Sequence, residues 1–585
     1  MYAIADQLES VVQRRYDRWR SAELPPYLKK ELNELKTAEI TDRFYKHIQL
    51  DAEGMKGKIG VGTNRVNRFS IRRVAGGLAD EIKSRGFAAQ QRGAVIGFDA
   101  RSMSRGFAEE AALVLAEHNI KAYLFERPVP TPMLAFAVRA LHAAAGVMIT
   151  AGNHSSDYNG LKIYGENGDP LQEELVSRVS GYMEAIYDGL QVKAMSAEEA
   201  LATGRLVMAG TEMEAAYLQH MGKIPLCKET NQLMGSSVRI VHLALQGAGG
   251  ETLIRALRQE GFTEVHAITE ERMPGGPFAR PARPDPYNPV NLAAAYEYAA
   301  KLEADLIIAT NPELNELSLS VKIEPGKYAL LSGSETAALL AEYMLMRKKS
   351  RNTLPRGGIV LKSALAGDLI SDVIARYGQR LEEVPAGFRQ IARKLEEQEN
   401  DPAGGGYLFG MEEYGGYAVS PYIRDKDAIQ ASLLIAEMAA YYKSVGLTVY
   451  KQLIQISRMY GWYAEDRIRL TFYGLEGWQQ VKLAMQRLRT EAPKTAGGQK
   501  ALKLLDYRTC EPNGGKRRQA GSPEAASCNL LKFALEDGSW YAFRQSSSEP
   551  AITVYFSSRD KEERACRHKL SAIRSDVLYH IESIV

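Results

Sequence analysis

Three stretches of the chain share one alternation of short apolar runs, polar loops and amphipathic segments. The first, at residues 94–125, reads AVIGFDARSMSRGFAEEAALVLAEHNIKAYLF, and the others lie at residues 238–269 and 358–384. Short apolar runs bounded by turn residues are typical of buried strands, and apolar positions three and four residues apart are typical of helices. Each stretch therefore predicts a β-α-β unit.

Each unit is followed, further along the chain, by one more apolar run that stops at a polar loop. These runs are GVMIT before Ala151, ADLIIAT before Asn311 and GYLFG before Met411. Repeated units of this kind predict three similar α/β domains with parallel or mixed sheets covered by helices. The part of the chain from about residue 465 differs, with RIRLTFYG and WYAFRQSSSEPAITVYF beside helical patterns, and predicts a smaller α+β domain.

The expected fold class is thus α/β, with three related α/β domains and a C-terminal α+β domain. We place domains I to IV at residues 1–208, 209–325, 326–463 and 464–585. Ligands of open α/β sheets collect beyond the carboxyl ends of the strands, so chemistry is expected in the loops there. Those loops lie at residues 150–160, 311–316, 411–417 and 544–551.

Composition narrows the partners that such a chain would have. Its 74 Lys and Arg residues nearly balance 71 Asp and Glu, so no overall field would gather nucleic acid or an anionic membrane. The four cysteines are far apart and form no CxxC pair, so neither a disulfide framework nor a zinc site is indicated. No apolar run approaches the roughly 18 residues of a membrane span. We expect a cytoplasmic protein.

The four loops, together with GVGTNRVNRFSIRR at residues 60–73 and RDKDA at residues 424–428, resemble motifs of the α-D-phosphohexomutase family, in particular its bacterial phosphoglucomutases. The resemblance spans nearly the whole chain in order. It implies four domains around a central cleft. It also implies an isomerase of carbohydrate metabolism, an intramolecular phosphotransferase that interconverts glucose 1-phosphate and glucose 6-phosphate through a phosphoserine, a bisphosphate intermediate and Mg²⁺.

The first loop departs from the family at the residue that carries the phosphoryl group. The family reads T-A-S-H-N-P and then Y-N-G, whereas Gly152 stands here at the serine position. Glycine has no side-chain oxygen to hold a phosphoryl group. Ser155 and Ser156 are weak substitutes, because a shift of three or four loop residues exceeds what reactive geometry tolerates. Lys162, which by resemblance assists proton transfer, is retained.

The second loop corresponds to the family's metal loop, D-P-D-A-D-R or D-G-D-G-D-R, whose aspartates bind Mg²⁺. Asn311, Glu313 and Asn315 stand here at the aspartate positions, and Glu316 replaces the arginine. Mg²⁺ favours compact octahedra of charged oxygen ligands, so two neutral amides predict a degraded site. The alternatives are a weaker or different site built on Glu313 with Glu316, and an ordinary acidic turn after a buried strand.

The third and fourth loops keep more of the family's substrate-binding groups. In the third, family G-F-E-E-S-Y-G, the paired glutamates are Glu412 and Glu413, which the resemblance places on sugar hydroxyls. In the fourth, family R-P-S-G-T-E-P-K, the chain keeps Arg544, Ser546 and Ser548, whose guanidinium and hydroxyls suit a phosphate. The alternative interpretations are a solvated acidic turn and a plain serine-rich turn.

Two further motifs extend the comparison with the family. Its sugar-specificity loop T-G-F-K keeps a cation here, as Arg389, and its G-T-A-G-L-R-G reads DAEGMKG at residues 51–57. Segments that build the fold match the family well, so the substitutions are concentrated at the chemistry.

The leading hypothesis is a phosphoglucomutase-like pseudoenzyme, impaired or inactive by the standard mechanism, that binds a hexose phosphate or hexose bisphosphate. One alternative is an active phosphotransferase that uses Ser155, Ser156 or a bound bisphosphate. The other is a non-catalytic interaction protein, for which the sequence names no partner.

Overall fold

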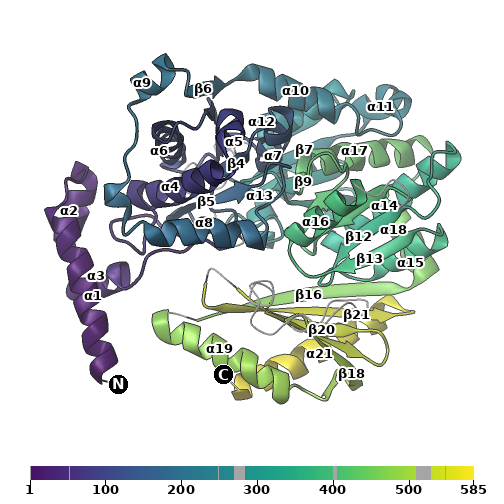
Figure 1. Cartoon of the computed structure of the whole chain (residues 1–585). Coiled ribbons are helices and arrows are strands. Elements are labelled where there is room, and N and C mark those ends of the chain that lie inside the picture. The colour runs from purple at the N-terminus through teal and green to yellow at the C-terminus, as the bar shows by residue number, and fades with distance from the viewer. Residues whose placement is uncertain are drawn as a thin grey trace.

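Four β-sheets follow one another along the chain, each with its own helices, in the computed structural model (Figure 1). The structure describes residues 2–51, 53–247, 249–268, 283–399, 405–472, 474–508, 529–546 and 549–584. No helix in these ranges is long and apolar enough to cross a membrane.

Domain I is built on a six-stranded mixed sheet of order β1-β5-β4-β2-β3-β6. Its strands are β1 (Met55–Lys58), β2 (Ala94–Phe98), β3 (Ala122–Phe125), β4 (Ala145–Ile149), β5 (Tyr158–Tyr164) and β6 (Leu206–Ala209). Its helices are α4 (Arg68–Ser84), α5 (Phe87–Arg92), α6 (Ser104–Glu117), α7 (Thr131–Ala140), α8 (Glu173–Ala185) and α9 (Ala197–Ala202). The first predicted β-α-β unit is confirmed as β2, α6 and β3, with β2 and β3 parallel.

The sheet of domain I is buried on both faces, which explains why its strands read as continuous apolar runs. Successive residues of β2 face opposite cores, so that Val95 packs with α7 while Ile96 packs with α4 and α6. Strand β4 leads directly into the first candidate loop, and β5 returns from it antiparallel to β4.

Three helices precede the sheet of domain I and pack around a small apolar core. They are α1 (Tyr2–Ser21), α2 (Pro26–Glu34) and α3 (Thr37–Phe44). Trp19 contacts Phe44 and Phe69 edge to face, with ring centroids 5.9 and 5.4 Å away. Figure 1 shows α1 and α2 at one side of the molecule, away from domains II and III.

Domain II carries a five-stranded sheet of order β11-β10-β9-β7-β8. Its strands are β7 (Ile240–Ala244), β8 (Val265–Ile268), β9 (Leu306–Thr310), β10 (Leu317–Glu324) and β11 (Lys327–Leu330). The helices are α10 (Thr211–Met221), α11 (Lys228–Met234), α12 (Gly250–Gln259) and α13 (Pro289–Leu302). Strands β7 and β8 are parallel, as the second unit predicts, and the sheet continues through β11, past the expected boundary at residue 325.

Domain III has a four-stranded sheet of order β13-β12-β14-β15. Its strands are β12 (Ile359–Ser363), β13 (Arg380–Val384), β14 (Tyr407–Met411) and β15 (Tyr417–Ala418). The helices are α14 (Gly333–Ser350), α15 (Leu369–Arg376), α16 (Phe388–Glu399), α17 (Ala428–Ser444) and α18 (Val449–Tyr460). The third predicted unit is confirmed as β12, α15 and β13, with parallel strands.

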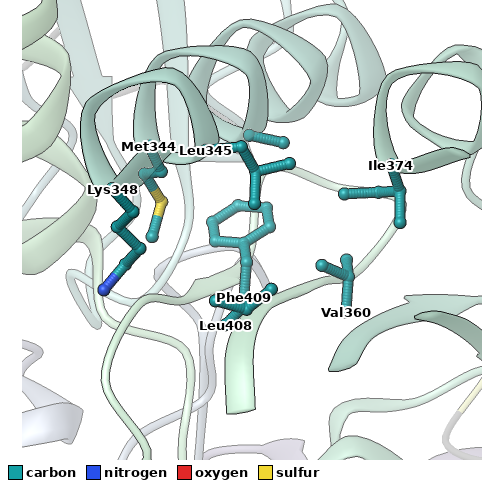
Figure 2. Close-up of a pocket in the computed structure, with 8 residues that line it drawn as sticks. Met344, Leu345, Lys348, Val360, Ile374, Leu408 and Phe409 are labelled. Carbon is teal, nitrogen blue, oxygen red and sulfur yellow. The ribbon is translucent and has the colours of Figure 1, made fainter. Parts of the chain in front are cut away.

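A small pocket in domain III lies between α14, α15 and the sheet (Figure 2). Apart from Lys348 its lining is apolar, including Met344, Val360, Ile374 and Phe409. It offers no set of polar groups that would recognise a sugar or a phosphate, so we regard it as a packing gap in the core.

Domain IV contains a six-stranded sheet of order β16-β21-β20-β19-β18-β17, in which every pairing is antiparallel. Its strands are β16 (Trp462–Thr471), β17 (Thr495–Ala496), β18 (Gln499–Asp506), β19 (Leu530–Leu535), β20 (Trp540–Gln545) and β21 (Ala551–Asp560). Helices α19 (Gly474–Thr490) and α21 (Glu563–Ile584) supply the rest of its core. The expected fold class, three α/β domains followed by an α+β domain, is confirmed.

Candidate functional site

The first loop, between β4 and β5, is held by one buried arginine. The guanidinium of Arg101 donates to the carbonyl oxygens of Gly152 at 2.6 Å, His154 at 2.7 Å and Ser155 at 2.8 Å. Arg101 itself is paired with the buried Asp99 at 3.2 Å. Charged hydrogen bonds of this kind are stronger than neutral ones, so the loop has a defined shape.

Gly152 faces the loop that follows β9. Its φ of 59° lies in the left-handed region, which glycine adopts without a steric penalty. A Cβ atom added here would lie 3.2 Å from Oε2 of Glu313. The structure therefore brings the expected phosphoserine position and the middle residue of the expected metal loop together, although they belong to different domains.

Lys162 on β5 is bound to this same carboxylate. Its Nζ lies 2.6 Å from Oε1 and 2.8 Å from Oε2 of Glu313. Burial favours the neutral amine, but Glu313 and Asp425 outweigh it and raise the pKa of Lys162. Burial likewise opposes ionisation of Glu313, yet the ammonium groups of Lys162, Lys56 and Lys426 lower its pKa to about 2. Lys162 is thus a firmly protonated counter-ion.

The serines later in this loop lie apart from that ion pair. The hydroxyl of Ser155 donates to a carboxylate oxygen of Asp157, within its own loop. Ser156 is exposed. The structure therefore places Gly152, and not Ser155, beside Lys162 and Glu313.

The asparagines of the second loop bind to one another and to the first loop. The amide of Asn311 donates to Oδ1 of Asn315 at 2.9 Å and to Oδ1 of Asn153 at 3.1 Å. Its own Oδ1 accepts from the backbone N–H groups of Asn315 and Glu316. The Asn311 amide is thus fully hydrogen-bonded and stabilises the turn, whereas the buried side-chain nitrogen of Asn315 has no hydrogen-bond partner among the described residues.

A second lysine lies at the end of this loop. Nζ of Lys426 is 2.7 Å from Oε1 of Glu316 and 2.9 Å from Oε2 of Glu412. Burial would lower the pKa of Lys426, but these two carboxylates raise it well above its usual range. In the sequence, Lys426 belongs to the family motif RDKDA at residues 424–428, but no role was assigned to it. Its place in that motif was the only signal that it belongs to the site.

These groups do not fit a magnesium ion of the family type. Mg²⁺ requires several hard oxygen ligands around an open position. Both oxygens of Glu313 contact Lys162, Glu316 contacts Lys426, and two of the expected ligands are amides. Within the described ranges, no three His, Cys, Asp or Glu side chains are arranged to hold a metal ion. The ammonium groups of Lys162 and Lys426 already bind the carboxylates that a metal ion would need as ligands.

The third and fourth loops meet at Arg544. Nη1 of Arg544 lies 3.2 Å from Oε1 of Glu413, and Nη2 lies 3.1 Å from Oε1 of Glu53. Glu413 also accepts a hydrogen bond of 2.6 Å from Ser363. The guanidinium is therefore shared between carboxylates of domains I and III. Nothing in the sequence singled out Glu53 except that it stands where the family has alanine.

Of the two serines expected to bind phosphate, one lies outside the described residues. That residue is Ser548. The hydroxyl of Ser546 accepts from the backbone N–H of Glu549 at 3.3 Å, which closes the turn.

Glu549 connects domain IV to the first loop. Its carboxylate lies 3.4 Å from Nδ1 of His154 and 3.0 Å from Arg283, and it also pairs with Arg469. The His154 ring stacks on Tyr158 with centroids 4.9 Å apart. Burial lowers the pKa of His154 despite the opposing effect of Glu549, so the imidazole is neutral near pH 7.

Arg389, expected at the sugar, bridges two domains. Its Nη2 lies 2.7 Å from Oε1 of Glu173, in the first turn of α8. The charged groups at the expected substrate positions thus have partners within the chain. Glu53, Glu173 and Lys426 are the partners that the sequence alone left unassigned.

Known proteins that are similar to this chain over most of its length are members of the family that its loop motifs resemble. A phosphoglucomutase from Staphylococcus haemolyticus is 29% identical over 516 residues, which cover 88% of this chain and 91% of that protein. A phosphoglucomutase (parafusin) from Paramecium is similar in fold, with a TM-score of 0.67 over 92% of this chain and 95% of that one, at 16% identity. A putative phosphomannomutase from Thermus thermophilus gives a TM-score of 0.66 over 91% and 99%, at 22% identity.

Family models cover the three α/β domains one by one. Those described as phosphoglucomutase/phosphomannomutase alpha/beta/alpha domains I, II and III match residues 47–188, 215–322 and 332–456. They follow the order of the sheets, and the first two include the loops that contain Gly152 and Glu313. The chain therefore belongs to the α-D-phosphohexomutase family of phosphoglucomutases and phosphomannomutases.

Proposed function

We propose that this chain is a phosphoglucomutase-like protein whose mutase activity by the phosphoserine and magnesium route is lost or strongly impaired, and whose cleft binds a hexose phosphate. One observation carries the proposal. The position of the family's nucleophilic serine is a left-handed glycine that faces Glu313, and Glu313 is bound by Lys162.

The family reaction needs three things that this arrangement does not supply. A side-chain oxygen must take up the phosphoryl group, a cation must offset its charge, and a basic group must accept a proton from the sugar hydroxyl. Gly152 has no side-chain oxygen, the second loop does not fit Mg²⁺, and Glu313 keeps Lys162 protonated. No step through a metal is proposed for this chain.

Binding of a hexose phosphate or hexose bisphosphate is supported by the cations of the cleft. Arg544 presents its guanidinium where the fourth loop of the family binds phosphate, and Lys56 and Lys162 act on the same region electrostatically. A guanidinium binds phosphate through paired charged hydrogen bonds. The Glu413 carboxylate lies 3.2 Å from Arg544, and that of Glu412 lies 2.9 Å from Lys426; by resemblance both suit sugar hydroxyls.

A coupled mutase assay tests the loss of activity. Purified protein would be given glucose 1-phosphate, glucose 1,6-bisphosphate and Mg²⁺, beside the Staphylococcus haemolyticus relative. We expect turnover at least about a thousandfold lower than that of the relative, since removing a nucleophile has effects of that order or larger. A Lys162→Ala variant controls for contaminating mutase. Turnover comparable with the relative and abolished by that substitution would overturn the proposal.

One observation favours an active phosphotransferase as the second candidate. Ser155 donates to Asp157, and a carboxylate next to a hydroxyl is able to act as its base. Intact-mass spectrometry after incubation with the bisphosphate discriminates: one phosphate per chain, absent from Ser155→Ala, supports it. An interaction protein would instead show no binding of any hexose phosphate. The cytoplasmic location and the lack of a nucleic-acid partner remain predictions from composition.

A further inference from the structure

The contact between domains III and IV is a buried polar network. Lys362 of β12 is 2% exposed, and its Nζ lies 2.8 Å from Asp368 and 3.1 Å from Glu383. Domain IV contributes Trp540, which donates to Asp368 at 3.0 Å, and Lys532, which donates to the carbonyl of Ala364 at 2.7 Å. If the domains separated, Trp540 and Lys532 would lose these hydrogen bonds and the apolar cluster that Trp540 shares with Ala364 and Leu365 would be exposed to water, so domain IV is firmly attached to domain III.

The contact between domains I and IV is of a different kind. Arg544 reaches domain I through Glu53, whose side chain is 50% exposed. The second connection joins Glu549 to His154, whose side chains are 12% and 14% exposed; because the imidazole is neutral near pH 7, this contact is not a full ion pair. The half-exposed pair of Glu53 with Arg544 is weak and is screened by salt. The molecule therefore opens more easily between domains I and IV than between domains III and IV.

Arg544 lies at this weak contact but is held from the other side. Glu413, which binds its other terminal nitrogen, has a side chain that is only 5% exposed, and it is fixed in turn by Ser363. When domains I and IV separate, Arg544 stays with Glu413 on domain III. Only the guanidinium edge that contacts Glu53 becomes available to solvent or to a ligand.

We propose that Glu53 is an internal competitor for the anion site of the cleft: its carboxylate occupies the Arg544 edge that a hexose phosphate uses, and the phosphate binds by displacing it. This inference rests on the proposed function. It goes further by naming the residue that controls access and by predicting that the chain lowers its own affinity for sugar phosphates.

The charges around Glu53 support this role. Partial burial opposes ionisation of Glu53, whose side chain is 50% exposed, but Arg544, Lys56, Lys162 and Lys426 lower its pKa to about 2, so the carboxylate is ionised under ordinary conditions. It is thus an anion surrounded by cations. A phosphate dianion placed there would gain the same cations with twice the charge and more acceptor oxygens.

Neutralising Glu53 without changing its shape tests the proposal. In calorimetric titrations with glucose 6-phosphate and with inorganic phosphate, we expect Glu53→Gln to bind roughly tenfold more tightly than wild type. In this variant the phosphate no longer competes with the Glu53 carboxylate for Arg544. The matched control is Glu109→Gln, which removes a carboxylate 46% exposed and paired with Arg105 on α6, away from the cleft. It should bind like wild type.

Hydrogen exchange without ligand gives a second, independent readout. We expect amides of residues 150–160 and of the end of β20 to exchange faster in Glu53→Gln, and also in wild type at high salt, but not in Glu109→Gln. Thermal unfolding would check that both variants fold.

The outcomes separate this inference from the proposed function. Equal affinities of wild type and Glu53→Gln, with unchanged exchange, would overturn the role of Glu53 alone. Failure of both proteins to bind either phosphate at millimolar concentration would overturn hexose phosphate binding together with the displacement. Tighter binding and faster exchange in Glu53→Gln alone would support both.

Discussion

At the residue scale, the chemistry of position 152 is decided by what lies opposite it. A serine there would place its hydroxyl next to a carboxylate that already binds an ammonium group. Both oxygens of that carboxylate, on Glu313, already contact Lys162. We therefore expect that changing residue 152 alone does not rebuild the family's site.

The variant Gly152→Ser tests this directly. A residue other than glycine at φ 59° costs roughly 1 kcal/mol, so we expect its free energy of unfolding, measured in urea, to fall by about that amount. We expect no gain of mutase turnover. Gly152→Ala shares the backbone cost without the hydroxyl and serves as the control. Mutase activity present in the serine variant alone would show that the metal loop is more competent than its contacts indicate.

The Glu313–Lys162 pair predicts a pH dependence of stability. The folded pKa of Glu313, about 2, is below its unfolded value near 4.5, so its stabilisation is complete above pH 4.5 and is lost as the pH falls toward 2. We expect Glu313→Gln to lower the free energy of unfolding by about 3 kcal/mol at pH 7, because it leaves a buried ammonium unpaired.

The measurement is urea unfolding of both proteins between pH 7 and pH 2. The difference between their free energies of unfolding should become smaller below pH 4.5. The double variant Glu313→Leu with Lys162→Met, which removes both charges, should be much less destabilised than the single variant. A difference in the free energy of unfolding that stays constant between pH 7 and pH 2 would contradict the low pKa of Glu313.

At the scale of elements, strand β16 carries an unusual carboxylate. Burial, with the nearby Glu335, raises the pKa of Glu465 to about 7 in spite of its hydrogen bond with Ser334. Because this folded pKa lies above the unfolded one, stability is complete below pH 4.5 and is lost as the pH rises through 7.

The variant Glu465→Gln should escape that loss. We expect it to be more stable than wild type at pH 8 by about 2 kcal/mol, and similar to wild type at pH 4.5, in chemical unfolding followed at both values. The neighbouring Asp466, paired with Arg574, provides the control Asp466→Asn. Equal free energies of unfolding of Glu465→Gln and wild type at pH 8 would contradict the prediction, because ionisation of Glu465 would then not destabilise the folded state.

The elements were predictable because their signals are local. The β-α-β units at β2, β7 and β12 follow from apolar spacing within about thirty residues, and the candidate loops follow from the ends of strands. The partners of the loop residues were not predictable, because Glu53, Glu173 and Lys426 reach them from distant parts of the chain. Only assembly of the domains decides that Arg389 contacts Glu173 and that Arg544 contacts Glu53.

At the scale of the whole molecule, ion pairs between domains join the candidate loops. This predicts how the protein responds to ligands. We expect Mg²⁺, and its removal with EDTA, to change the thermal midpoint by less than about 1 °C, since only a ligand that binds the native state raises it. Glucose 6-phosphate at millimolar concentration should raise the midpoint. A rise of several degrees with Mg²⁺ alone would show a metal site of another kind.

Strands β16 and β21 pair along ten residues, from Trp462 opposite Asp560 to Thr471 opposite Ala551. The end of the ladder where the chain enters domain IV is thus also the end where it leaves toward α21. A force applied between the carboxyl terminus and the rest of the protein, as a processive unfoldase applies it, loads these hydrogen bonds one after another and not all at once. Once α21 has been pulled away, domain IV would peel open from this end under a small force, before domains I to III are disturbed.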